Sequence, residues 1–182
     1  MSMAAPTKAG PLRSEQIILF RIGEQLFALS SSSVQEVRSA DSLSGGAHEI
    51  SAPGIDKVRQ FVRRGPNTLF LVSGAAHFGL SAPDGILAFV LRNTRTALLV
   101  DSIEKMTAIT RLQALPLSFC HEERQWYRGL TALDQTIVPV VRSEGFLSDD
   151  ELLMLEAALP PPEVTSEDTE AESDTDFSEE LN

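Results

Sequence analysis

Hydrophobic residues along the chain stand mostly in short runs rich in Ile, Leu, Val and Phe, and Gly, Asp, Asn or Ser separate the runs. Runs of this length and composition, bounded by turn-forming residues, predict β-strands rather than long helices. The predicted strand segments are 15–22, 25–29, 54–63, 68–72, 85–92, 96–103, 125–133 and 136–141. Many short strands and few helices predict a mostly β fold of the barrel class.

Two tight turns and two short helical segments are also predicted. Residues 23–24 (Gly-Glu) separate two strands with Gly at the first turn position, which is typical of a two-residue type II′ hairpin. Residues 134–135 (Asp-Gln) predict a second hairpin. Serines followed by valines three apart predict one helical turn at 32–37. Near the end, a serine followed by three acids caps a short amphipathic helix at 148–159, which three prolines end.

The charge is divided unevenly between a body and a C-terminal tail. The 182 residues carry a formal net charge of −11, yet residues 144–182 hold 14 Asp and Glu and no Lys or Arg, which leaves 12 acids against 15 bases before them. We expect a flexible leader at 1–14, a folded domain at 15–159 and a disordered acidic tail at 160–182, because the tail offers little apolar surface to offset the entropy of ordering. The main interpretation is a solvated tail. The alternatives are a tail that screens the basic body and one that folds on a partner.

Cysteine content and hydropathy exclude several protein classes. Cys120 is the single cysteine, so an intramolecular disulfide and a four-cysteine zinc site are excluded. No apolar run reaches the roughly 20 residues of a membrane span, and the N-terminus lacks the run of roughly 7–15 apolar residues of a signal peptide. We therefore expect a cytoplasmic protein with no direct membrane insertion.

The histidines and the cysteine give weak support for catalysis or metal binding. Cys120 and His121 are adjacent, and adjacent side chains on a strand point to opposite faces, which is poor geometry for a thiolate–imidazole pair. His48 and His77 lie far from them in sequence. We expect no catalytic group, cofactor or metal site here, and we predict that the protein is not an enzyme.

Arg64, directly before Gly65 and in a cluster with Arg59 and Arg63, is the sharpest candidate binding residue. A guanidinium can bind a partner carboxylate through two parallel hydrogen bonds and can stack on apolar surface. The alternative is a solvated loop arginine. Nucleic acid binding is a third interpretation, and the acidic tail and the aromatic content of 6% argue against it.

Four segments in register resemble the CheW-like domain family, the coupling proteins of bacterial chemosensory arrays. They are IILFRIGEQLFALSSSSVQEV at 17–37, RRG at 63–65, ALLVDSIEKM at 97–106 and YRGLTALDQTIVPVV at 127–141. In the family these positions carry an opening strand with a V-x-E-V turn, an N-L-R-G loop, a second strand and turn, and a closing hairpin. The resemblance covers about residues 15–147 in the family's order and spacing.

The resemblance implies a fold of two packed five-stranded SH3-like β-barrels with short helices and a C-terminal helix. It also implies a non-catalytic adaptor that couples a chemoreceptor or a related sensory input to a CheA-type histidine kinase in chemotaxis or motility signalling. Other chemosensory adaptors are further expected partners. The alternative is a small β-barrel ligand-binding or enzyme domain unrelated to chemosensory signalling.

The candidate partner-binding residues combine this resemblance with the apolar pattern. In the loop that carries the family's Arg-Gly, Val62 and Arg63 replace its Asn and Leu. Apolar side chains in the two V-type turns belong to the core if they are buried, and form a groove for a partner helix if they are exposed together. Asp101 is expected to hold a turn by accepting backbone N–H bonds. The candidate set is Arg64, Gly65, Val37, Ile103 and Met106.

Overall fold

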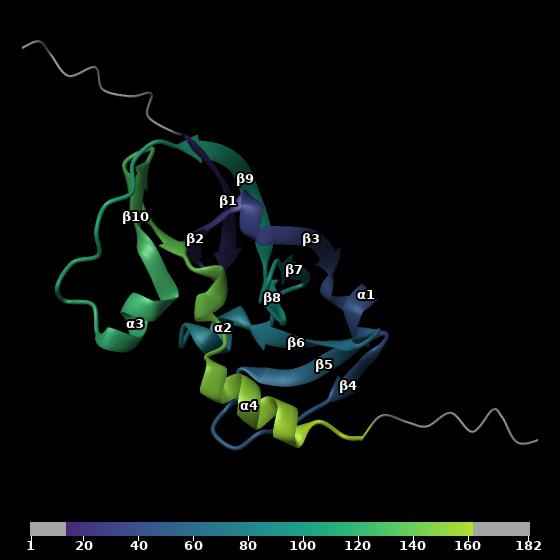
Figure 1. The fold of residues 1–182 in the computed structure, drawn as a ribbon. Coiled ribbons are helices and arrows are strands. Elements are labelled where there is room, and N and C mark those ends of the chain that lie inside the picture. The colour runs from purple at the N-terminus through teal and green to yellow at the C-terminus, as the bar shows by residue number, and fades with distance from the viewer. Residues whose placement is uncertain (1–13, 162–182) are drawn as a thin grey trace, which may run out of the picture.

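The computed structural model describes residues 14–161, in which strands dominate the regular structure (Figure 1). The strands are β1 (Glu15–Ile22), β2 (Gln25–Ser30), β3 (Val34–Ser39), β4 (Ala47–Glu49), β5 (Val58–Arg64), β6 (Asn67–Ser73), β7 (Leu87–Leu91), β8 (Thr96–Val100), β9 (Ser102–Ile109), β10 (Tyr127–Leu133) and β11 (Thr136–Val141). The helices are α1 (Ala40–Ser44), α2 (Gly74–His77), α3 (His121–Trp126) and α4 (Asp149–Ala158), with 3-10 turns η1 (Ser31–Ser33) and η2 (Ser143–Gly145). The predicted mostly β class is confirmed. The predicted leader and acidic tail lie almost entirely outside the described residues.

The strands form two sheets that pack against each other. The five-stranded sheet has the order β10-β11-β2-β1-β9, and the six-stranded sheet has the order β3-β7-β8-β6-β5-β4. Neighbouring strands are antiparallel, except that β11 is parallel to β2 and β6 is parallel to β8. In residues 14–161 no ladder joins the two edge strands of either sheet. The prediction of two five-stranded barrels is therefore wrong in the closure of the sheets and in the strand number of one of them.

Local features explain both differences. α1 connects the edge strands β3 and β4, and its Leu43 is buried in the apolar cluster that the six-stranded sheet encloses, so a helix stands where closing strand pairs would lie. In the other sheet an isolated bridge between Gln113 and Leu130 links the segment after β9 to β10. The sixth strand, β4, has the sequence Ala-His-Glu. This segment has no hydrophobic run, so its pattern predicts no strand.

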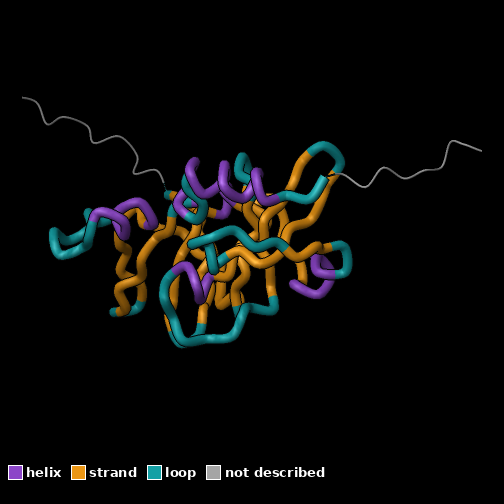
Figure 2. Tube along the Cα trace, turned by 90° about the horizontal axis from the view of Figure 1, so that it is seen from below, coloured by secondary structure: helices purple, strands orange, loops and turns teal. Residues whose placement is uncertain are grey.

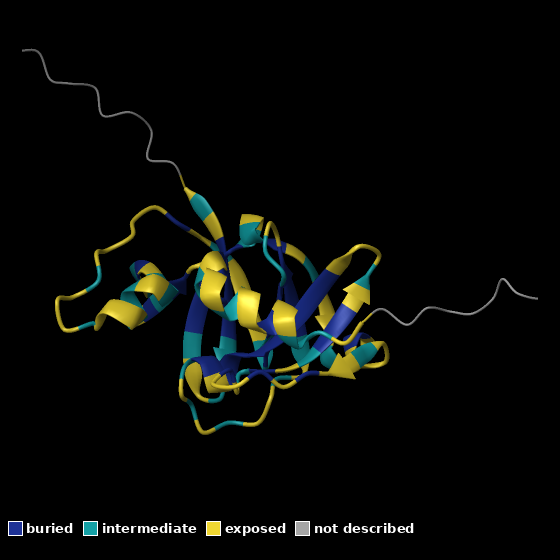
Figure 3. Ribbon diagram, turned by 60° about the horizontal axis from the view of Figure 1, so that its bottom comes forward, coloured by how far each residue is buried: buried dark blue, intermediate teal, exposed yellow. Residues whose placement is uncertain are grey.

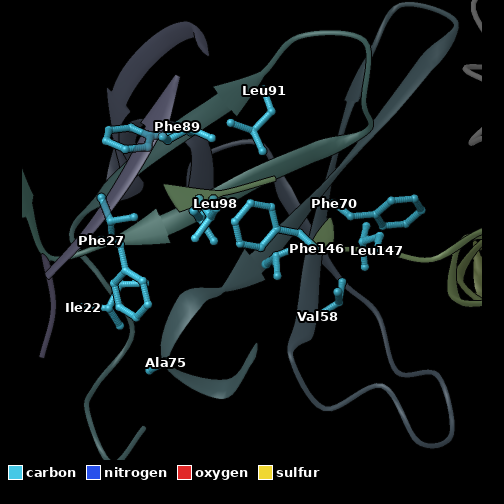
Figure 4. Close-up of a cluster of buried hydrophobic side chains, with 14 of the residues drawn as sticks. Ile22, Phe27, Val58, Phe70, Ala75, Phe89, Leu91, Leu98, Phe146 and Leu147 are labelled. Carbon is cyan, nitrogen blue, oxygen red and sulfur yellow. The ribbon is translucent and has the colours of Figure 1, made fainter. Parts of the chain in front are cut away.

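The central strands are buried on both faces, which explains their continuous hydrophobic runs. Successive side chains of a strand point to opposite faces. Along β1, Ile17 and Leu19 therefore join a cluster enclosed by the five-stranded sheet, whereas Ile18 and Phe20 join a larger cluster between the two sheets. The same alternation divides β6, β7 and β8 between the larger cluster and the one inside the six-stranded sheet. Figure 3 shows buried residues along the strands of both sheets, and Figure 4 shows side chains of the larger cluster.

Both predicted hairpins are confirmed. Gly23 has a φ of +58°, in the left-handed region that favours glycine, and the turn joins Ile22 to its strand partner Gln25. Its N–H donates a 2.5 Å hydrogen bond to an Asp101 carboxylate oxygen, so the prediction that Asp101 holds a turn is also confirmed. At 134–135 both residues have positive φ, as a type I′ hairpin requires.

The predicted C-terminal helix is confirmed as α4, which lies across strands of the six-stranded sheet (Figure 2). Ser148 and Glu151 form a capping box at its start, in which each side chain accepts a hydrogen bond from the other's backbone N–H. Leu155 is fully buried against the cluster between the sheets. Glu151 pairs with Lys57, and Glu156 pairs with Arg95. Among residues 14–161, no helix has the length and apolar character needed to span a membrane.

Candidate partner-binding surface

Arg64 lies at the end of β5, directly before a two-residue turn. The register pairs Arg64 with Asn67 of β6, and Gly65 and Pro66 form the turn between the two strands. Gly65 has a φ of +57°, which a side chain would oppose, so glycine suits this position for a local physical reason. The arginine therefore stands on a strand end of defined geometry rather than in a long loop.

The Arg64 guanidinium forms an ion pair with Glu36 of the edge strand β3. β3 and β5 are not neighbours in the sheet order, so the sheet must curl for these side chains to meet. Glu36 lies opposite Val90, and Arg64 stands two residues after Val62. Both valines belong to the cluster that the sheet encloses, which places Glu36 and Arg64 on the same inner face, at its open margin.

Two arginines hold the Glu36 carboxylate in its charged form. Hydrogen bonds from Arg64 and then from Arg38, whose Nε lies 3.0 Å away, lower the pKa of the Glu36 carboxyl. The Arg64 and Glu36 side chains both remain partly exposed. A guanidinium has five N–H donors, and the Glu36 contact uses one nitrogen, so donors remain for a second carboxylate. The ion pair orients Arg64 and leaves N–H donors of its guanidinium group free of this contact.

Val37 is exposed on β3, and the helical turn predicted at 32–37 is wrong beyond its first residues. A 3-10 turn ends at Ser33, and β3 begins at Val34. Residues 34–39 form a strand rather than a helical turn because β3 pairs with β7 through backbone hydrogen bonds. Val34 is buried, whereas Val37, which lies opposite Phe89, is 42% exposed at the margin of the sheet.

Ile103 and Met106 lie on β9, the edge strand of the other sheet, and are 39% and 62% exposed. Two strand residues three apart normally face opposite sides. Here a β-bulge between the pairs of Leu19 and Phe20 shifts the register, so Ile103 lies opposite Phe20 and Met106 lies opposite Ile18. Both side chains thus point to the face of the sheet that carries the cluster between the sheets.

These apolar side chains border one contact between the two sheets. The rings of Phe20 and Phe89 pack edge to face with centroids 5.3 Å apart. Ile103 is the strand partner of Phe20, and Val37 is the strand partner of Phe89. We call Val37, Ile103 and Met106 the apolar border of the two sheets. Arg64 contacts the same strand, β3, through Glu36, the residue before Val37, but on the other face of the sheet.

Cys120 and the histidines occupy separate places. Cys120 is the exposed N-cap of α3, where its Sγ accepts a hydrogen bond from the Glu123 N–H, and His121 follows it in the helix rather than on a strand. His48 lies exposed on β4. His77 is buried in α2, with ring centroids 4.7–5.0 Å from the rings of Phe78, Trp126 and Phe146.

A polar cluster around His77 has no signal in the sequence. The Lys57 ammonium lies 3.5 Å from His77 Nδ1 and forms an ion pair with Glu151 of α4 at 2.8 Å. Burial, followed by the Lys57 charge, lowers the pKa of His77 to about 3. The imidazole therefore stays neutral near pH 7 and fills space among aromatic rings. His77 and Glu151 stand 20 and 94 positions after Lys57, which is why sequence spacing alone could not reveal the cluster.

Comparison with known proteins places this geometry in a family. The family model described as "CheW-like domain" matches residues 16–151, from β1 into the start of α4. The chain belongs to the CheW-like domain family. The predicted resemblance is confirmed, and the match includes all five candidate partner-binding residues.

Individual relatives support the same assignment. The CheW-like chain is 27% identical over 144 residues to a protein of Rhizobium etli named "Probable chemotaxis protein CheW", covering 75% of this chain and 89% of the relative. Its structure resembles that of the scaffolding protein TtCheW from Thermoanaerobacter tengcongensis with a TM-score of 0.61 and 13% identity, covering 81% of this chain and 96% of the other. The likeness at this identity concerns the fold.

Proposed function

We propose that this CheW-like protein is a non-catalytic, cytoplasmic adaptor that couples a chemoreceptor or a related sensory protein to a CheA-type histidine kinase. The observation that carries the proposal is the family match over residues 16–151, which spans both sheets and the whole apolar border. The names of the relatives, a probable chemotaxis protein and a scaffolding protein, support a scaffold role in chemosensory signalling.

The surface chemistry supports a helical partner segment with an acidic residue. Val37, Ile103 and Met106 are exposed aliphatic side chains on two edge strands, and such side chains suit the apolar face of an amphipathic helix. Arg64 retains free donors next to β3, and an arginine at the side of an apolar contact can bind a carboxylate through two hydrogen bonds. The predicted residues thus offer one apolar and one charged element of recognition.

Capture from the native host tests the proposed partners. The full chain, tagged and expressed at its native level, is crosslinked in cells, and its partners are identified by mass spectrometry. We expect a CheA-type kinase and chemoreceptor-like proteins to be enriched. Met106→Glu should reduce their recovery, because a buried charge opposes an apolar contact. Ile137→Glu, at an exposed position of β11 outside the apolar border, is the matched control and should recover both partners. Recovery of neither partner class by the unaltered chain would contradict the proposal.

A further inference from the structure

Four arginines gather at one end of the six-stranded sheet. Arg63 and Arg64 precede the turn between β5 and β6, and Arg92 and Arg95 stand in the turn between β7 and β8. β6 and β8 run parallel, so the turns that precede them lie at the same end of the sheet. The Arg95 Nε also donates to the Thr68 carbonyl, which ties the second turn to β6. We call Arg63, Arg64, Arg92 and Arg95 the arginine end.

The arginine end carries more positive than negative charge. Arg64 pairs with Glu36, and Arg95 pairs with Glu156. Within residues 14–161, the Arg63 guanidinium donates to the Pro160 carbonyl and the Arg92 guanidinium donates to the Val34 carbonyl. Neither arginine forms an ion pair with a carboxylate of this part of the chain. Two guanidinium charges therefore have no carboxylate partner in this part of the chain, although both side chains lie at the surface.

The chain leaves the domain at this same place. α4 leads toward the end of the sheet where β5 and β6 meet (Figure 1), and the Arg63 guanidinium donates to the Pro160 carbonyl at 2.5 Å. The residues that follow, 162–182, contain nine Asp and Glu and no Lys or Arg. Their acids are Glu163, Glu167, Asp168, Glu170, Glu172, Asp174, Asp176, Glu179 and Glu180. A strongly acidic segment thus starts beside an arginine cluster with unmatched positive charge.

We propose that residues 162–182 dock on the arginine end of their own domain through carboxylate–guanidinium contacts. A chain of this length can extend up to about 70 Å, so its acids reach all four arginines. A tethered segment meets its site at an effective concentration of the order of millimolar, which favours this contact over the same segment in solution. Guanidinium groups bind carboxylates through charge-assisted hydrogen bonds, and several pairs together offset the entropy of ordering the segment.

The contact has a regulatory consequence that rests on the proposed function. A tail that lies on the arginine end covers Arg64, which the proposed partner contact also uses. The tail is then a built-in competitor for partner carboxylates. Asn and Gln in place of the nine acids should tighten binding of the CheA-type kinase by about tenfold, which corresponds to about 1.4 kcal/mol. Equal affinity of the two chains would overturn this consequence. Absence of kinase binding by both chains would contradict the proposed function and leave the intramolecular contact intact.

A nitroxide label on the tail tests the contact itself, without any partner. Ser173→Cys in a Cys120→Ser background carries the label, and serine keeps the N-cap hydrogen bond that the Cys120 Sγ supplies to α3. In NMR spectra of the full chain at low salt, we expect selective broadening of the amide signals of residues 63–65, 67 and 92–95. At about 1 M NaCl, where the Debye length is ~3 Å, the broadening should disappear.

Two variants and one mixing experiment complete the test. Arg63→Gln combined with Arg92→Gln should largely remove the broadening, whereas Arg111→Gln, at an exposed arginine of the segment after β9, should leave it unchanged. Broadening that is absent at low salt, spread evenly over the domain, or unaffected by the double substitution would overturn the proposal. In the mixing experiment, a nitroxide-labelled chain is added to an isotope-labelled chain that carries no nitroxide. Broadening of the signals of the isotope-labelled chain would also overturn the proposal, because the tail would then lie on a second copy.

Discussion

At the scale of single residues, Arg64 forms an ion pair with Glu36 within the domain, and we propose that it also binds a carboxylate of the kinase. Arg64→Ala removes a partly exposed ion pair, and pairs of this kind contribute about 0.2–1 kcal/mol to stability. An arginine hot spot at an interface contributes about 2 kcal/mol or more, which is roughly thirtyfold in affinity. We expect kinase affinity to fall by this factor while the melting temperature changes little.

The exposed Arg59 on the same strand provides the control for this experiment. Arg59→Ala removes the same charge from β5 and should leave the affinity unchanged. Equal affinities of the Arg64→Ala and unaltered chains, measured by calorimetry, would refute the binding role of Arg64. A variant that loses its affinity together with its folded circular-dichroism spectrum would show that Arg64 is structural.

His77 predicts a specific dependence of stability on pH. Its pKa is about 3 in the folded chain, below the ordinary value of 6.5 that the unfolded chain retains. The unfolded state therefore binds a proton first as pH falls, and stability is lost progressively from about pH 6.5 toward pH 3. Glu36 and Glu15 also have lowered pKa values, and their contribution is lost below their ordinary value of 4.5. The change in stability between pH 6.5 and pH 4.5 therefore reports the protonation of His77 in the unfolded chain.

A substitution at His77 isolates this effect. His77→Phe places a ring without a titratable group among the surrounding aromatic rings and should flatten the pH dependence of the free energy of unfolding between pH 6.5 and 4.5. His121→Phe, at an exposed position of α3, should leave the dependence as it is. Denaturant titrations at several pH values provide the measurement. An unchanged slope in His77→Phe would contradict the buried, neutral state of this histidine.

At the scale of elements, α4 contributes to stability through one face. Leu155 is fully buried in the cluster between the sheets, whereas Leu153 is 64% exposed two positions earlier. Leu155→Ala should lower the free energy of unfolding by about 2–5 kcal/mol, because it leaves a cavity in the core. Leu153→Ala should change it by less than about 0.5 kcal/mol. Urea denaturation curves of the two variants compare them directly. Equal effects would mean that α4 does not pack as described.

Strands with strong hydrophobic runs could be predicted from the sequence, and elements formed by tertiary context could not. The run at 17–22 predicts β1 because both of its faces are buried, whereas β4 contains Ala, His and Glu and forms only by pairing with β5. α3 has no predicted counterpart, and its last two residues overlap the start of the strand predicted at 125–133, which begins at Tyr127 in the structure. Its capping box, with Cys120 at the N-cap, is an unusual signal because cysteine seldom takes that position.

The candidate site divides in the same way. Arg64 and Gly65 could be named from the family pattern. The contact between Arg64 and Glu36 depends on the curl of the six-stranded sheet, and local sequence spacing does not reveal the strand order of that sheet. Ile103 and Met106 are three residues apart, a spacing at which strand residues normally face opposite sides. The structure places both side chains on one face through a β-bulge, which depends on the register with β1.

At the scale of the whole molecule, the two sheets share one apolar cluster and should unfold together. Within residues 14–161, this cluster takes side chains from both sheets and from α4. A chain that ends at Pro161 should therefore melt in one transition within a few degrees of the full chain, as electrostatic contacts of a tail contribute little to stability. A decrease of more than about 8 °C would correspond to more than about 2–4 kcal/mol and would mean that the tail packs against the body.

The adaptor role is tested most directly by titrating the purified full chain into the CheA-type kinase of the same organism in a calorimeter. The proposal predicts saturable binding with a defined stoichiometry, weakened by Met106→Glu and retained by Ile137→Glu. Saturable binding that both substitutions leave unchanged would place the contact away from the apolar border. No binding of the unaltered, folded chain to the kinase would contradict the central claim that this CheW-like protein couples a sensory input to that kinase.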